Sequence, residues 1–159
     1  MADSTQDTLK HRGWVKKFTA MFCNKMLDRA ERHDESKLHA PEKEMFDQVG
    51  ESHPLGKSEF GSAEYAEGKK LLGPALDHHY AENDHHPQHF HDGIAGMNLY
   101  QLLEMYLDWH AASKRNKDGS IIQSVEHNIG EFKIEPQLAA ILMNTARLDS
   151  QEETDDSQN

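Results

Sequence analysis

The sequence is poor in cysteine and has no long apolar run. Cys23 is the single cysteine among 159 residues, so the chain can form neither an intrachain disulfide nor a multi-cysteine zinc site. No apolar run approaches the roughly 20 residues that a helix needs to cross a bilayer. The first residues also lack the apolar core of a signal peptide. We therefore expect a cytoplasmic protein with no membrane partner.

Basic residues are outnumbered by acidic ones and form no run. The chain has 17 Lys and Arg against 28 Asp and Glu, a formal net charge of −11. This balance argues against duplex nucleic acid as a partner. Residues 149–159 hold five acids and no Lys or Arg, a composition that predicts a disordered acidic tail. Residues 1–148 are then expected to form a single domain.

Strand-like alternation, β-branched runs, internal repeats and Gly-rich phosphate loops are all lacking. Apolar residues recur instead at three- and four-residue steps, the spacing of helices that bury one face. Gly, Pro and polar stretches separate these segments. We expect an all-α, compact bundle of about five to seven helices. The helical segments are 5–32, 41–49, 62–72, 74–83, 97–115, 120–128 and 136–148, with a loop at 50–61 and a turn at 116–119.

Histidine is the residue that the chain has in abundance. Six of the 12 histidines fall between His78 and His91, and neutral imidazole is the commonest side-chain metal ligand. On a helix His78 and His79 point about 100° apart, so one could bind a metal while the other serves an outer role or binds a different ion. His85 and His86 follow on a predicted loop. The alternative is a solvated histidine-rich loop with incidental metal affinity.

Further candidate ligands lie upstream of this segment. His11 shares the apolar stripe of the first predicted helix with Trp14, so we expect it to point inward, as a core residue or as a ligand. His33 and Asp34 are adjacent in sequence. Lys37 comes one helical turn after Asp34, on the same face if the segment is helical. It could neutralise a bound anion or pair with Asp34.

Asp108 lies within the most apolar predicted helix. A buried carboxylate needs a metal, an ion pair or hydrogen bonds, and the sequence leaves these alternatives open. Glu104, one turn earlier on the same face, is a candidate outer partner. Lys114 and Arg115 at the end of this helix are candidates for binding an anionic substrate, although solvation is the commoner role of cations there.

Taken in order, an early His, an adjacent His-Asp, paired histidines and a late Asp resemble the HD-domain superfamily of metal-dependent phosphohydrolases. The HDESK stretch is similar to the HD-x-x-K form of the HD-GYP cyclic-dinucleotide phosphodiesterases and of the di-iron oxygenases on this fold. The chain departs from the former group because it lacks the Gly-Tyr-Pro signature and has compressed spacings before His78.

A second resemblance covers most of the chain. The stretches EFGSAEY, ALDHHYAENDHHPQHF, MNLYQLLEMYLDWHAAS and NTA are similar to a family of small phage and bacterial proteins that has no settled activity. This resemblance implies the cytoplasm of a bacterial or phage-infected cell. It supports the site positions more than any substrate.

The resemblance to the HD superfamily implies an HD-domain-like helical bundle that holds one or two divalent ions. Mn, Fe, Co and Zn suit such nitrogen and oxygen donors, and Mg is a further candidate. Asp34 could bridge two ions. The candidate metal ligands are His11, His33, Asp34, His78, His79, His85, His86 and Asp108.

These residues favour a metal-dependent phosphohydrolase that acts on a nucleotide or related small phosphate ester. Metal-activated water would attack the phosphorus, with Asp34 at the metal and Lys37 stabilising charge on the phosphate. Glu35 or a non-ligating histidine would protonate the leaving oxygen. A di-iron oxygenase and a non-catalytic, metal-stabilised binding module share the same donors and remain alternatives. An oligomer is compatible with each of these three functions.

Overall fold

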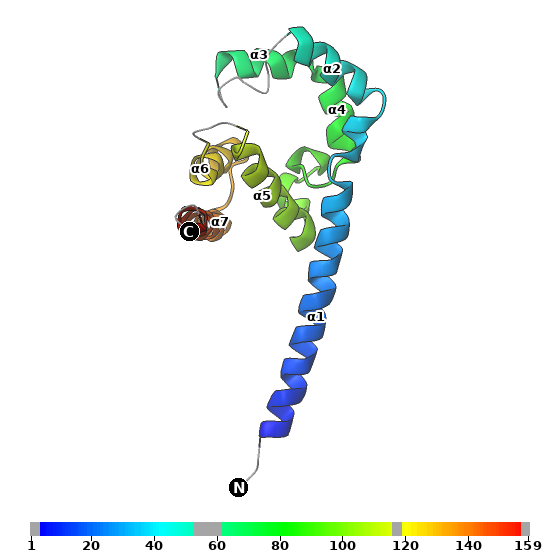
Figure 1. Cartoon of the computed structure of the whole chain (residues 1–159). Coiled ribbons are helices and arrows are strands. Elements are labelled where there is room, and N and C mark those ends of the chain that lie inside the picture. Colours follow the sequence, from blue (N-terminus) through cyan, green and yellow to red (C-terminus); the bar gives the residue numbers. More distant parts are fainter. Residues whose placement is uncertain (1–3, 53–61, 116–118, 157–159) are drawn as a thin grey trace. The chain divides into compact units, whose positions relative to one another are not determined.

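The computed structural model describes residues 4–52, 62–115 and 119–156, and every regular element in these ranges is helical. The all-α prediction is confirmed, and each helix overlaps a segment predicted from apolar spacing. The helices are α1 (Thr5–Arg32), α2 (Glu42–Ser52), α3 (Ala63–Leu71), α4 (Gly73–Glu82), α5 (Leu99–Ser113), α6 (Ile121–Glu131) and α7 (Pro136–Asp156) (Figure 1). Short 3-10 turns are η1 (Glu35–Leu38), η3 (Pro87–His89) and η4 (Gly93–Gly96).

Two predicted connections fall on the gaps between these ranges. The predicted loop at 50–61 lies outside the described residues except for residues 50–52, which are helical. Most of the predicted turn at 116–119 also lies outside them. None of the described helices combines the length and hydropathy that crossing a bilayer requires.

The chain divides into two compact units, residues 1–33 and 34–159, where the composition predicted one domain. Helix α1 makes up the first unit. Trp14 stacks on Phe18 with ring centroids 5.8 Å apart, yet both side chains are more than half exposed. His11 is exposed on the same helix, and its predicted inward orientation stays a prediction. A unit made of one helix has no second element of its own to cover an apolar stripe.

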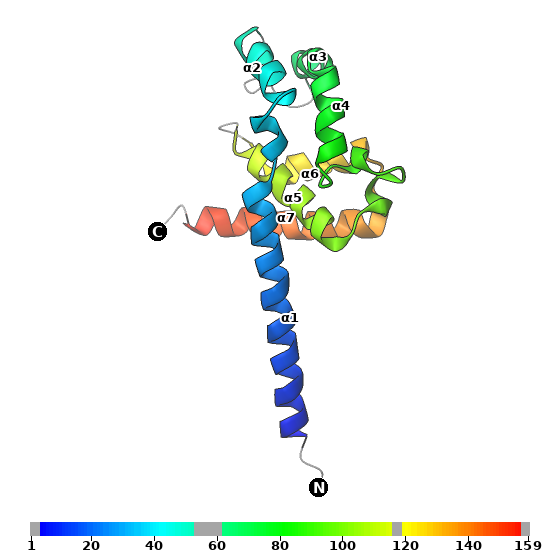
Figure 2. The ribbon, with the colours of Figure 1, turned by 90° about the vertical axis from the view of Figure 1, so that its right-hand side faces the viewer.

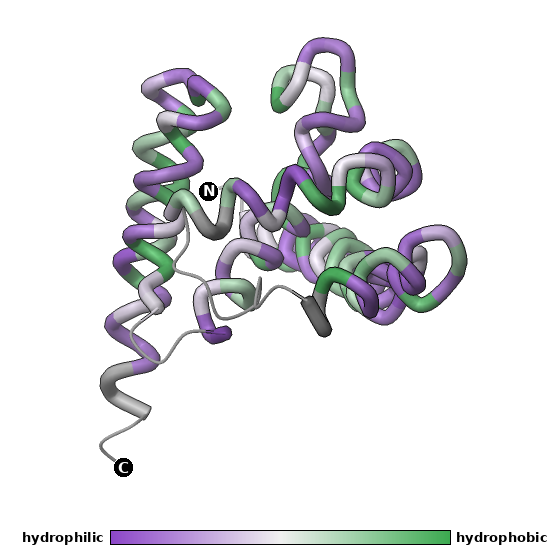
Figure 3. Tube along the Cα trace, turned by 90° about the horizontal axis from the view of Figure 1, so that it is seen from above, coloured by the Kyte–Doolittle hydropathy of each residue, from purple (hydrophilic) through white to green (hydrophobic). Residues whose placement is uncertain are grey.

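The hydrophobic core of the second unit lies where α6 packs against α5 and α7 (Figure 2). Hydrophilic and hydrophobic residues alternate along the helical turns, so each helix can turn an apolar face to its neighbours (Figure 3). The Asn98 side chain caps the start of α5 by accepting hydrogen bonds from two backbone N–H groups. The Gln101 side chain in turn accepts a hydrogen bond from the Asn98 backbone N–H. The buried core residues are Met105, Tyr106, Trp109, Ile121, Val125, Ile134, Leu142 and Ala146.

Helices α2, α3 and α4 precede this core in the same unit. Helix α2 packs against α4 and against η1. Helix α3 packs against α4 (Figure 2). The loop that follows α4 then leads through η3 and η4 to α5. The Gln101 side-chain amide donates to Asp84 Oδ2 at 2.6 Å, which ties this loop to the first turn of α5. The loop therefore joins the two groups of helices.

Helix α7 continues well past residue 149, where the composition predicted a disordered tail. Asp149 accepts a hydrogen bond from the Tyr106 hydroxyl at 2.5 Å, and Glu153 lies 2.8 Å from His110 Nε2 and pairs with Lys114. Burial, together with the Asp149 carboxylate, raises the pKa of Tyr106 above its usual value. These partners on α5 explain why part of the acidic segment is ordered, which its own composition does not reveal.

Truncation of Met105 tests the position of the core. Met105 is 1% exposed, and Leu107 on the same helix is 45% exposed. We expect Met105→Ala to lower the free energy of unfolding by about 2–5 kcal/mol, because it leaves a cavity. Leu107→Ala, the matched control, should change it by about 0.5 kcal/mol or less. Urea denaturation followed by circular dichroism measures both, and equal effects would contradict this core.

Candidate metal centre

Asp34, which joins α1 to η1, is the carboxylate around which the site is arranged. Its backbone is left-handed, with φ 58°, a conformation that Asp tolerates better than most non-glycine residues. The carboxylate has two different neighbours. Oδ2 accepts a charge-assisted hydrogen bond from Lys37 Nζ at 2.6 Å, while Oδ1 lies 3.3 Å from His79 Nε2 and 3.5 Å from His85 Nε2. One oxygen is thus neutralised and the other faces imidazole rings.

Four side chains converge at this point. Asp34, His79, His85 and His86 each bring one donor atom to a place where all the donors lie within 4.8 Å of one another. His79 and His85 are buried, and the other two are partly buried. The Nε2 atoms of His79 and His86 are 2.8 Å apart. Three imidazole nitrogens and a carboxylate oxygen form a donor set of the kind that binds divalent metals, so this cluster could hold a metal ion.

His86 has an environment that keeps its ring neutral. Burial, and after it the neighbouring His85 and His79, lower the pKa of His86 to about 3, while Asp108 and Asp34 act in the opposite direction. Metal binding requires a deprotonated ligand. His86 is therefore in the protonation state of a ligand at neutral pH.

A fully buried glutamate on α2 contacts the Nδ1 side of the His79 ring. Glu42 is 0% exposed, and its Oε2 lies 2.9 Å from His79 Nδ1 while its Oε1 lies 2.7 Å from His78 Nδ1. The Ser36 hydroxyl donates to Oε2 at 3.0 Å. Burial on its own would raise the pKa of Glu42, but the hydrogen bonds with His78, Ser36 and His79 outweigh it and hold this pKa below its usual value. Glu42 is therefore an anion.

Glu104 on α5 has the corresponding position behind His85. Its Oε1 lies 3.4 Å from His85 Nδ1, and the residue is 7% exposed. The sequence had suggested Glu104 as an outer partner of Asp108. The structure instead places it beside a histidine of the cluster.

The structure separates the two adjacent histidines of α4. His79 turns its Nε2 toward Asp34 and His86. His78 is 38% exposed by its side chain, and its Nδ1 contacts Glu42. Neighbouring residues diverge by about 100° around a helix, which explains why His78, a predicted ligand, lies outside the cluster. His85 and His86 lie on a loop, where helical geometry does not separate neighbouring side chains, and both belong to the cluster.

Asp108 and Glu35 were predicted to serve the same site. Asp108 on α5 is partly buried and close enough to influence the pKa of His86, but the cluster found among the described residues does not include it. Glu35 is exposed at the start of η1. Glu35 is not part of the cluster found among the described residues.

The remaining predicted residues lie elsewhere. Lys114, a candidate for substrate binding, pairs with Glu153 on α7, and Arg115 is exposed. Lys114 is therefore paired with an acid of the segment that was expected to be disordered. His11 and His33 belong to the first unit, and their role as ligands stays a prediction.

Glu42 is the functional candidate that sequence reasoning missed. Both Glu42 and Glu44 fall in the first turn of α2, where acids suit the helix dipole, so neither stands out in the sequence. Glu44 is exposed and Glu42 is buried. Only the packing of α2 against α4 distinguishes them.

One family model matches residues 1–148, that of DUF5662, a family of unknown function. The chain belongs to this family. The match includes all four residues of the cluster as well as Glu42 and Glu104. No curated protein and no solved structure matches the chain.

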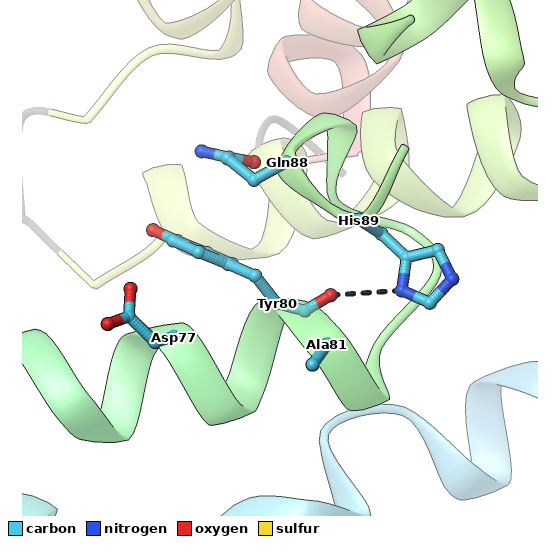
Figure 4. Close-up of a pocket in the computed structure, with 5 residues that line it drawn as sticks. All are labelled: Asp77, Tyr80, Ala81, Gln88 and His89. Atoms are coloured by element: carbon cyan, nitrogen blue, oxygen red, sulfur yellow. Dashed lines mark hydrogen bonds between the residues drawn. The ribbon is translucent and has the colours of Figure 1, made fainter. Parts of the chain in front are cut away.

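Beside the cluster, this DUF5662 protein has a hollow on α4 and η3. The His89 ring lies 3.0 Å, through Nδ1, from the Tyr80 carbonyl oxygen (Figure 4). The Tyr80 ring also meets the His86 ring, with centroids 5.1 Å apart. A single aromatic ring thus connects the hollow to the cluster. The hollow is lined by Asp77, Tyr80, Ala81, Gln88 and His89.

Loss of one donor tests whether the cluster binds metal. We expect the protein to retain stoichiometric divalent metal after loading and dialysis, and His79→Ala to lose most of it, because His79 lies at the centre of the contacts. His91 is a matched control, since its side chain is 99% exposed in the same histidine-rich segment. Elemental mass spectrometry measures the metal content. Equal content in His79→Ala and His91→Ala would place the metal elsewhere.

Proposed function

We propose that this chain is a metal-dependent phosphohydrolase of the HD-domain type that acts on a nucleotide or related small phosphate ester. The observation that supports it most directly is the convergence of Asp34, His79, His85 and His86 from η1, α4 and the following loop. The proposal includes a bacterial or phage-infected cell as the setting and its cytoplasm as the compartment.

One or two divalent ions are part of this proposal, with Mn, Fe, Co or Zn suiting the donor set and Mg a further candidate. The four residues of the cluster would hold the first ion. A bound divalent ion supplies a Lewis acid that activates water at neutral pH and neutralises charge on a phosphoryl group.

In this proposal Lys37 would bind the substrate phosphate. Its ammonium group is held at Asp34, and its side chain is 30% exposed. An ammonium group has three N–H donors, so Lys37 can keep its bond to Asp34 and still donate to a phosphate oxygen. Such a preorganised donor stabilises negative charge that develops in the transition state.

His78 is the better candidate for the proton donor to the leaving oxygen. It contacts Glu42 through Nδ1, and the same carboxylate contacts His79 of the cluster. Glu35, the other candidate, is exposed on η1. The hollow beside Tyr80 would accept the organic part of the ester, since its aromatic ring offers a stacking surface next to His86.

Hydrolysis by the metal-loaded protein tests the proposal. We expect release of phosphate or nucleoside from members of a broad panel of nucleotides and phosphate esters, with loss on chelation and recovery on adding metal. Asp34→Asn should lower the rate of hydrolysis by roughly a hundredfold or more. The substitution weakens metal binding and removes the ion pair that holds Lys37 in position. Asp47→Asn is the matched control, since Asp47 forms an exposed 2.6 Å pair with Lys43 on α2.

The outcome against the proposal is equally specific. If the protein binds stoichiometric metal but hydrolyses no member of the panel, the phosphohydrolase assignment is rejected. A mixed-valent iron signal with oxygen consumption would then favour the oxygenase. Unfolding on metal removal, without any turnover, would favour a structural site.

A further inference from the structure

We propose that Glu42 and Glu104 are positioning residues that fix the tautomers of His79 and His85, so that both rings present an unprotonated Nε2 toward the metal. This inference rests on the metal site of the proposed function, but it does not depend on which reaction the metal serves. Neither glutamate belongs to the cluster itself.

The His79 ring is held between two carboxylates. Its Nδ1 lies 2.9 Å from Glu42 and its Nε2 lies 3.3 Å from Asp34. An ionised carboxylate can only accept hydrogen bonds. His79 Nδ1 also lies 3.0 Å from Asn83 Nδ2, but that amide donates its two hydrogens to the Ser36 oxygen and to the His79 carbonyl oxygen. The shorter contact with Glu42 therefore places the ring hydrogen on Nδ1, and a neutral ring then has its lone pair on Nε2. That atom faces the other donors of the cluster.

His85 repeats this arrangement with Glu104 of α5. Its Nδ1 lies 3.4 Å from Glu104 and its Nε2 lies 3.5 Å from Asp34. Both histidines are at most 3% exposed by their side chains. Two buried rings thus have the same order of contacts, with a glutamate at Nδ1 and the shared Asp34 at Nε2. Such a carboxylate behind a ligating histidine sets the ring orientation and raises its basicity.

The Glu42 carboxylate is itself held in place. Ser36 donates to Oε2, and Asn83 Nδ2 donates to the Ser36 oxygen at 2.7 Å and to the His79 carbonyl oxygen at 2.8 Å. His78 occupies Oε1. Both oxygens of Glu42 are therefore engaged, and rotation of the carboxylate would break several bonds at once.

A purely structural purpose does not account well for a carboxylate at this depth. Taking a charge out of water is costly, and a well-packed apolar residue often stabilises a fold as much as a buried ionic group does. Orientation of an imidazole, by contrast, requires an acceptor of fixed position. Glu42 satisfies this requirement.

The experiment compares Glu42→Gln and Glu104→Gln with Glu44→Gln in the full chain. Gln keeps the shape of Glu, but its amide can donate as well as accept, so it no longer specifies the tautomer. Glu44 is an exposed glutamate in the same turn of α2 as Glu42. We expect zinc affinity, measured by chelator competition, to fall about ten- to hundredfold in the first two variants and to stay unchanged in the third.

A second readout needs no metal. Imidazole nitrogen chemical shifts of the metal-free protein should show His79 with hydrogen on Nδ1, and this preference should weaken in Glu42→Gln. Glu42→Asp, which keeps an accepting carboxylate, should recover part of the affinity and of the tautomer preference. If Glu42→Gln does not fold, Glu42→Asp replaces it in both measurements, and Glu104→Gln remains an independent test.

Several outcomes would overturn the inference. Unchanged zinc affinity and an unchanged His79 tautomer in folded Glu42→Gln would do so, as would a wild-type His79 with its hydrogen on Nε2. Weakened zinc binding in a wild-type protein that hydrolyses no phosphate ester has a different meaning. It would reject the proposed reaction and leave the positioning role standing.

Discussion

The Asp34 carboxylate is shared between an ammonium group and imidazole rings, and the candidate site depends on this division. Lys37 occupies Oδ2 at 2.6 Å, which leaves Oδ1 directed at His79 and His85. A left-handed backbone at Asp34 begins the turn into η1, and that turn brings Lys37 and Ser36 to the same region. One residue thus determines where both the converging donors and their outer partners meet.

The fold serves this arrangement by joining two groups of helices at one loop. Helices α2 and α4 contribute Glu42 and His79, and α5, which is buried against α6, contributes Glu104. Between them the loop after α4 contributes His85 and His86 and is tied to α5 by the bond from Gln101 to Asp84. The well-packed core of α5 to α7 therefore provides a rigid support for one side of the cluster.

The candidate site could be predicted in part, and the missing part has a physical explanation. Dense histidines and the adjacent His33 and Asp34 pointed to Asp34, His85 and His86, because residue type and proximity in sequence carry that signal. The choice between His78 and His79 depends on which face of α4 meets α2. Glu42 could not be distinguished from Glu44, since burial of a helix-start glutamate is decided by a partner about 36 residues away in sequence.

The sequence by itself determined the helices, because apolar spacing, helix caps and breakers act within a few residues of one another. It also excluded a multi-cysteine metal site, since only one cysteine is present. Tertiary structure decided which nitrogen of each ring faces the cluster and which glutamates stand behind it. It likewise decided that α7 would continue through residues 149–156, because Tyr106, His110 and Lys114 on α5 offer partners to its acids. Contacts between residues far apart in sequence depend on packing, which no local pattern encodes.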